Sequence, residues 1–271
     1  MKCNKITKPL AFFVLAASSQ FTTAHVNIAP DNAFSLGDEP REYLEGRSAY
    51  VNVNLPHSCF DAEDNSYATT DVILILPNGS SLPEDFYTAD RSGNTYGANA
   101  VMGTKARVSR NWKKVKVVKG AVDEFYSHGA KTEDTRAVKW LKGYVDNDHY
   151  DNLEIKTSFP KIDPESCTGT LRVELPAIQY CRKGYVTAWI GTTGSARFPA
   201  DSAKLRLEET YVPYLNVVRD VANNPYPSSC PTDTEGNVIS TTETVRPTDA
   251  DIDAYAGRRG RHDHDRHDRD D

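Results

Sequence analysis

Short segments in which apolar and polar residues alternate recur along most of the chain, and they predict β-strands. The period of two is clearest in residues 49–55 (AYVNVNL) and 170–175 (TLRVEL). Further strand-like segments are residues 71–76, 114–119, 153–159, 185–190 and 204–208. Turn-forming residues separate these segments, and no long stretch repeats its apolar residues at the helical period of 3.6.

Many short strands with regular turn signals favour a single antiparallel β-sandwich, of the immunoglobulin or cupredoxin type. A parallel βαβ architecture is disfavoured because the sequence lacks the crossover helices that it requires. Residues 135–142 (TRAVKWLK) fit a short helix or a strand equally well. The predicted fold class is therefore all-β.

The composition changes at about Asn223, after which proline, serine, threonine and acidic residues dominate and large apolar residues are scarce. Residues 257–271 (GRRGRHDHDRHDRDD) are of low complexity. Such a segment buries too little apolar surface to offset its ordering entropy. We therefore expect a β-sandwich domain over residues 25–222 and a disordered tail over residues 223–271.

The first 24 residues have the pattern of a secretory signal peptide. Three lysines precede a short apolar run, residues 9–17 (PLAFFVLAA), and small residues lead to Ala24. The run is too short to span a bilayer about 30 Å thick, and no later segment is long and apolar enough to do so. We expect cleavage after Ala24, a periplasmic or secreted protein, and no transmembrane segment in the mature chain.

The net charge narrows the class of partner. Cleavage removes three lysines and no acidic residue, so the formal net charge changes from −6 to −9. An acidic surface argues against nucleic acid and anionic lipid as partners, and it suits a protein that meets cations.

Four cysteines remain in the mature chain, an even number that predicts two disulfides in an oxidising compartment. They are Cys59, Cys167, Cys181 and Cys230. Since no pair has the CxxC spacing, a zinc cage is disfavoured. The sequence itself leaves three connectivities open.

A histidine at the first mature position has distinctive metal chemistry. The α-amine and the imidazole Nδ1 of His25 can chelate one metal ion in a single ring. The pKa of an α-amine is about 7.7–8.0, so a metal ion can displace its proton near neutrality. Nitrogen-rich tetragonal sites favour Cu(II). The sequence therefore predicts a Cu(II) site at His25, unless cleavage occurs elsewhere.

Ordered motifs along residues 25–200 resemble the YcnI-like exported proteins, which bind copper through an N-terminal histidine. The motifs are HVNIAP at 25–30, YVNVNLPHSC at 50–59, TTDV at 69–72, ILP at 75–77, Trp112, VKW at 138–140, HYDNL at 149–153, LPAIQYC at 175–181, Gly184, and WI at 189–190. The resemblance implies a β-sandwich and a copper site with a single histidine, a carboxylate and a tryptophan. His25 takes the place of the histidine and Trp189 that of the tryptophan. An indole N–H is a donor, so Trp189 would contribute its ring face and shield the metal. The alternative is that Trp189 is an ordinary core aromatic.

The carboxylate of the family's copper site has no direct counterpart here. The segment after Pro56 reads His57-Ser58-Cys59, and the nearest acidic residues are Asp61, Glu63 and Asp64. One of these acids, or His57 itself, would complete the site. His57 would make it a two-histidine site, which still suits Cu(II). The alternative is that His57 is an ordinary loop histidine.

The resemblance also implies a disulfide pairing, because Cys59 and Cys181 both lie in family motifs. A bond between them would fix the loop beside the copper site and leave Cys167 to pair with Cys230. The tail carries His262, His264 and His267 among aspartates, a composition that binds metal loosely or only solvates the chain.

The leading functional hypothesis is a non-enzymatic exported protein that captures or buffers Cu(II) and passes it to another copper-trafficking protein. A copper-dependent enzyme similar to the lytic polysaccharide monooxygenases is the second, because those enzymes also begin with histidine and use a second one, which His57 would supply. A structural envelope module with incidental metal binding is the third. No local motif of a hydrolase occurs in the sequence.

Overall fold

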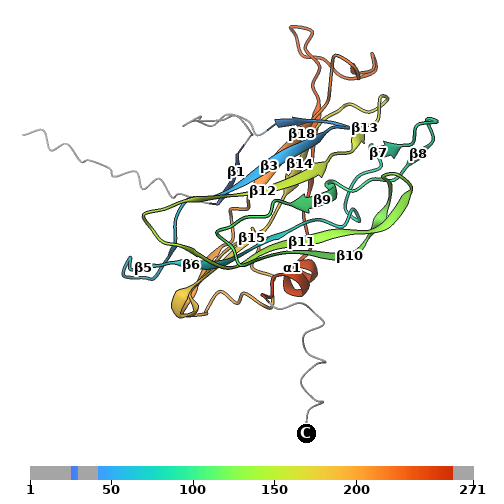
Figure 1. The fold of residues 1–271 in the computed structure, drawn as a ribbon. Helices are drawn as coiled ribbons and strands as arrows, with labels where there is room; N and C mark the ends of the chain where they lie inside the picture. The colour runs from blue at the N-terminus through green and yellow to red at the C-terminus, as the bar shows by residue number, and fades with distance from the viewer. Residues whose placement is uncertain (1–25, 30–41, 259–271) are drawn as a thin grey trace, which may run out of the picture.

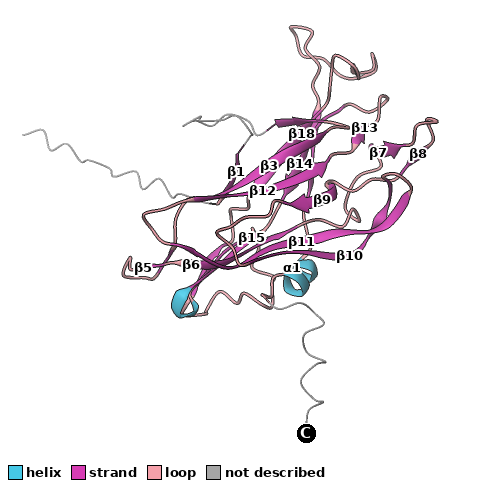
Figure 2. Ribbon diagram, in the orientation of Figure 1, coloured by secondary structure: helices cyan, strands magenta, loops and turns pink. Residues whose placement is uncertain are grey.

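The described residues form a β-sandwich with an α-helix packed against its outside (Figures 1 and 2). The structure is a computed structural model that describes residues 26–29 and 42–258. The sequence-based assignment to the all-β class is confirmed. His25, the expected signal peptide and the tail histidines lie outside the described residues.

One layer of the sandwich is a six-stranded sheet of order β10-β11-β6-β15-β16-β17. Its strands are β6 (Thr69–Ile75), β10 (Lys114–Tyr126), β11 (Ala130–Val145), β15 (Ala177–Cys181), β16 (Val186–Trp189) and β17 (Leu205–Glu208). Residues 135–142, which the sequence allows as helix or strand, lie within β11.

The facing layer consists of two four-stranded sheets, of order β1-β3-β12-β9 and β19-β14-β18-β2. The first contains β1 (Asn27–Ala29), β3 (Ser48–Leu55), β9 (Met102–Ala106) and β12 (Asp151–Ser158). The second contains β2 (Glu42–Leu44), β14 (Thr168–Glu174), β18 (Tyr214–Val218) and β19 (Thr241–Val245).

Short elements complete the described fold. A three-stranded sheet joins β7 (Phe86–Ala89), β8 (Thr95–Tyr96) and β13 (Lys161–Ile162), and a two-stranded sheet joins β4 (Cys59–Phe60) and β5 (Ser66–Tyr67). A 3₁₀ turn, η1, covers Arg182–Gly184, and the helix α1 covers Asp249–Tyr255. None of the helices in residues 26–29 and 42–258 is long and apolar enough to span a membrane.

The main hydrophobic core lies between the two layers, and the alternating strands supply it. Val51, Val53 and Leu55 of β3 are fully buried, whereas the asparagines between them are partly exposed. The apolar run of β6 does not alternate with polar residues, because both faces of the strand are covered. Val72 and Leu74 pack into the main core, and Ile73 packs into a second cluster on the outer side of the six-stranded sheet.

The sheets are mixed, which corrects the expectation of a purely antiparallel sandwich. Strands β14 and β19, β16 and β17, and β18 and β2 pair in parallel. Parallel neighbours need long connections, which are usually helical. Here an irregular segment joins β16 to β17, and the other two parallel pairs join strands with further strands between them in the sequence. The missing crossover helices therefore did not exclude parallel pairs.

The expected disordered tail is wrong for residues 223–258, which belong to the folded domain. Strand β19 extends the sheet beside β14, with Val245 fully buried. Helix α1 packs on the second cluster through Ile252 and Ala256, both 0% exposed. Low average hydrophobicity hid these few buried side chains, and the domain continues past residue 222 through them.

Charged and capping groups also fix α1 to the sheet. Thr248 and Asp251 form a reciprocal capping box at its start. Arg136 of β11, which is buried, pairs with Asp251 at 2.7 Å. The hydroxyl of Tyr180 donates to the Ala256 carbonyl at 2.8 Å, and Lys139 donates to the Gly257 carbonyl.

Ile252→Ala should lower the free energy of unfolding by about 2–4 kcal/mol, because it leaves a cavity under α1. Ile239→Ala is the matched control, since Ile239 lies in the same segment and is 54% exposed. It should change stability by less than about 0.5 kcal/mol. Denaturant unfolding measures both. Equal midpoints for the two variants would mean that α1 does not contribute to the core.

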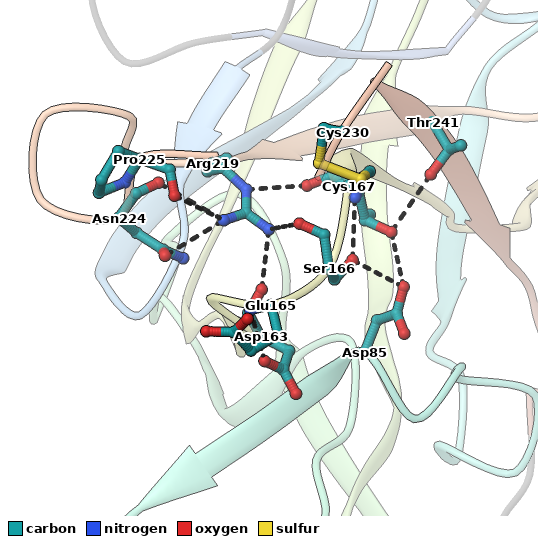
Figure 3. Close-up of a disulfide and its surroundings, with 11 residues drawn as sticks. Asp85, Asp163, Glu165, Ser166, Cys167, Arg219, Asn224, Pro225, Cys230 and Thr241 are labelled. Atoms are coloured by element: carbon teal, nitrogen blue, oxygen red, sulfur yellow. Dashed lines mark hydrogen bonds between the residues drawn. A yellow bond between two sulfur atoms is a disulfide. The ribbon is translucent and has the colours of Figure 1, made fainter. Parts of the chain in front are cut away.

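The second disulfide, between Cys167 and Cys230, anchors the segment that leads to β19 (Figure 3). The guanidinium of Arg219 is buried beside it and donates only to oxygens that carry no charge. Its acceptors are the carbonyls of Thr168, Asp163, Ser166, Asn224 and Pro225 and the amide oxygen of Asn224. The Asn224 amide nitrogen donates in turn to the buried carboxylate of Glu45 at 2.9 Å. Arg219 thus joins several loops that have little regular structure.

Candidate metal centre

The pairing of β1 with β3 fixes the position of Val26 in the fold. Asn27 pairs with Asn54 and Ile28 with Val53, in antiparallel register. Val26 is fully buried, and its carbonyl accepts a hydrogen bond from the Tyr211 hydroxyl at 3.1 Å. The backbone next to residue 25 is therefore held at the end of the sheet where β3 finishes.

His57 lies just beyond that end of β3, in the short segment between Leu55 and β4. Its side chain is partly buried, and its ring centroid lies 5.4 Å from that of Phe60. The Nδ1 atom lies 2.5 Å from the Ser58 carbonyl oxygen. Because a carbonyl oxygen only accepts, Nδ1 is the donor, and a neutral ring in this orientation has its lone pair on Nε2. Metal-binding histidines are commonly oriented in this way by a backbone carbonyl.

A hydrogen bond and a disulfide attach the segment that contains His57 to β15. The Nε2 of Gln179 donates to the His57 carbonyl at 2.7 Å. Two residues further along each segment, Cys59 and Cys181 form a disulfide with a Cα–Cα distance of 6.1 Å. Both disulfides have the connectivity that the resemblance implied.

Trp189 reaches the same region from β16. It is 2% exposed and belongs to the main core. It pairs with Ala177, whereas Gln179 pairs with Thr187. Side chains two residues apart on a strand share a face, so Trp189 and Gln179 are diagonal neighbours on the inner face, with Cα atoms about 7–8 Å apart. Trp189 is thus a core residue whose neighbour contacts the His57 segment.

Asp61 is occupied by the hairpin turn between β4 and β5. Its carboxylate accepts from the Tyr67 hydroxyl at 2.7 Å, from the side chain and backbone of Asn65, and from the backbone of Glu63. Partial desolvation acts to raise the pKa of Asp61, but these hydrogen bonds outweigh it and lower the pKa. As a copper ligand, Asp61 would have to give up turn contacts.

The same turn recurs twice in the chain, which supports its structural role. Asp90 binds Asn94 and Asp233 binds Asn237 with the same spacing of four residues. In each turn the residue directly before the asparagine has a positive φ. These residues are Asp64, Gly93 and Gly236. A recurrent Asp-x-x-x-Asn pattern between strands was therefore a readable turn signal.

Glu63 lies in the first of these turns, and its side chain is exposed. The described residues contain no group of three or more His, Cys, Asp or Glu side chains placed to hold a metal ion. The expected ligand His25 lies outside those residues.

Sequence reasoning missed Gln179 in this region. It is a polar residue inside an apolar strand, which was a visible signal in the LPAIQYC motif. His149 is exposed, and its Nδ1 lies 2.5 Å from a carboxylate oxygen of Asp146. That hydrogen bond raises the pKa of His149. The adjacent Asn147 accepts a long hydrogen bond from Ser58, at 3.5 Å.

Comparison with known proteins agrees with part of the sequence-based resemblance. A family model described as a domain of unknown function (DUF1775) matches residues 96–207, and this domain is found in YcnI-like proteins. The matched residues include Gln179 and Trp189. No curated protein matches the chain. A crystal structure of an uncharacterized protein from Nocardia farcinica with an immunoglobulin-like fold is similar to this chain, with 15% sequence identity and a TM-score of 0.36. The alignment covers 65% of this chain and 91% of the other.

Two disulfides within one domain are typical of proteins in oxidising compartments. Together with the DUF1775 match, they indicate a periplasmic or extracellular β-sandwich domain.

Proposed function

We propose that the protein is exported, begins with His25 after cleavage, and binds one Cu(II) ion at this N-terminus as a copper buffer or chaperone. The observation that carries the proposal is the fixed entry of β1. Val26 is buried and β1 pairs with the last residues of β3. The described chain therefore begins at the end of β3 that leads into the segment carrying His57.

The donor set suits Cu(II). His25 would supply its α-amine and imidazole, and His57 would supply Nε2, the atom that holds the lone pair when Nδ1 donates to the Ser58 carbonyl. Three nitrogen donors favour Cu(II) over the other divalent ions of the first transition row. His57 thus takes the role that a carboxylate has in the related copper proteins, and Asp61 remains in its turn.

A terminal site also suits release of the metal. Two of the three donors belong to the first residue, so a partner can displace them one at a time without unfolding the sandwich. Trp189 would contribute an aromatic wall rather than a lone pair. This fits capture of copper and transfer to another copper-trafficking protein.

Replacing His57 tests the donor set. The mature wild-type protein should bind one Cu(II) with a tetragonal EPR spectrum, and His57→Ala should bind it at least tenfold more weakly, with altered EPR parameters. His149→Ala is the control, because His149 is exposed and pairs with Asp146. It should match the wild type. If His57→Ala also matches the wild type, His57 is not a ligand. If the wild type binds no copper at one equivalent, the proposed function is wrong.

Copper monooxygenases also combine an N-terminal histidine with a second histidine, so catalysis needs its own assay. We propose binding without catalysis, because the ordered motifs resemble the YcnI-like proteins and residues 96–207 match the DUF1775 model. The copper-loaded protein with a reductant should produce no oxidised products from chitin or cellulose. Copper-dependent product formation would favour the enzyme.

A further inference from the structure

Gln179 is a fully buried polar residue whose hydrogen bonding is incomplete. It is 0% exposed and lies between apolar residues on β15. Its Nε2 donates to the His57 carbonyl and to the Thr69 hydroxyl. Its Oε1 is buried and accepts no hydrogen bond in the described part of the chain.

The orientation of this amide is fixed by its partner. The His57 carbonyl can only accept a hydrogen bond, so Nε2 must face it and Oε1 must point elsewhere. A buried acceptor without a partner costs about 1–3 kcal/mol. An apolar side chain of similar length would avoid that cost. Residues that break a folding rule in this way tend to lie at functional sites.

Gln179 also lies where it can control the position of His57. Its hydrogen bond to the His57 carbonyl joins the same two segments as the Cys59–Cys181 disulfide. The two links are two residues apart along each segment. The disulfide fixes the segment on one side of His57, and the amide fixes the His57 backbone itself. With Nδ1 bonded to Ser58, little freedom remains for the ring.

We propose that Gln179 is a positioning residue that holds His57 in place for copper binding. The inference rests on the copper function proposed above. Gln179 acts through the His57 backbone and does not itself contact the metal ion. Outer contacts that orient a metal ligand typically change affinity by about 10–100-fold when removed.

A purely structural role is the competing explanation, and a matched control separates the two. Gln179→Met keeps the length of the side chain and removes the bond to His57. Thr69→Val removes the other partner of the Gln179 amide, at a residue that is also fully buried. It leaves the bond to the His57 carbonyl in place. Gln179→Asn provides a second variant if Gln179→Met does not fold, because the shorter side chain cannot reach both segments.

Copper affinity and EPR should be measured for the mature wild type and these variants, together with the ¹⁵N NMR signals of the metal-free His57 imidazole. We expect Gln179→Met to weaken Cu(II) binding about tenfold or more, shift the EPR parameters and broaden the His57 signals. Thr69→Val should retain the wild-type values.

Two results would overturn the inference while the wild type still binds copper. One is a Gln179→Met protein with wild-type affinity and spectrum. The other is an equal loss in Gln179→Met and Thr69→Val, which would reveal a general effect on packing. Absence of copper binding by the wild type would instead overturn the proposed function, and this inference with it.

Discussion

Replacing Cys59 and Cys181 together by alanine should lower the free energy of unfolding by about 4 kcal/mol. The disulfide closes a loop with a sequence separation of 122 residues, and loops of this length lose much unfolded-chain entropy when they are cross-linked. The variant should also bind Cu(II) more weakly, because the segment that carries His57 loses its covalent anchor. Urea unfolding and copper titration measure the two effects.

The other disulfide is the matched control for this result. The Cys167→Ala, Cys230→Ala double variant removes a cross-link with a separation of 63 residues, so its expected loss of stability is similar, about 4 kcal/mol. It lies beside Arg219, away from the His57 segment, and copper affinity should stay at the wild-type value. Equal losses of copper affinity in both double variants would contradict a local role for Cys59–Cys181.

Arg219→Met should be the most damaging single substitution among those considered, with a loss of about 3–5 kcal/mol. The Arg219 side chain is nearly fully buried and donates to oxygens from several loops. Methionine fills part of the space but removes every hydrogen bond that the buried guanidinium donates to these loops. Arg219→Lys should not restore stability, because a lysine has fewer donors and lacks the planar fork.

Arg206→Met is the control for this prediction. Arg206 pairs with Glu208 at 2.8 Å, but its side chain is 46% exposed, and such pairs contribute little. Its loss should change the free energy of unfolding by less than about 0.5 kcal/mol. Denaturant unfolding of both variants tests the difference. A small effect of Arg219→Met would mean that the surrounding loops are held by other contacts.

The sequence predicted the fold class because local alternation carries the information. Strand β3 shows this directly, since its valines face the core and its asparagines do not. The parallel pairing of β14 with β19 could not be predicted, because it joins segments far apart in the chain without a local signal. The sequence did not predict that residues 223–258 are folded. Their folding depends on a few buried side chains, such as Ile252, and not on the average composition of the segment.

The candidate site was predictable to a similar extent. The motifs predict His57 and Trp189 as site residues, and the disulfide pairing that the resemblance implied is present in the structure. The role of Asp61 in a turn depends on Tyr67 and Asn65, whose contacts a scan for metal ligands does not weigh. The bond from Gln179 to His57 crosses 122 positions of sequence, so only the folded chain reveals it.

The central claim is that copper binds to the free N-terminus at His25, and one comparison tests it most directly. Cu(II) titration with EPR should be carried out on the mature protein and on a variant with one extra alanine before His25. The extension leaves every side chain in place and moves the free amine away from the imidazole. We expect one tight tetragonal Cu(II) in the mature protein and loss of that site in the variant. Identical binding by the two proteins would contradict the claim and place the metal elsewhere in the chain.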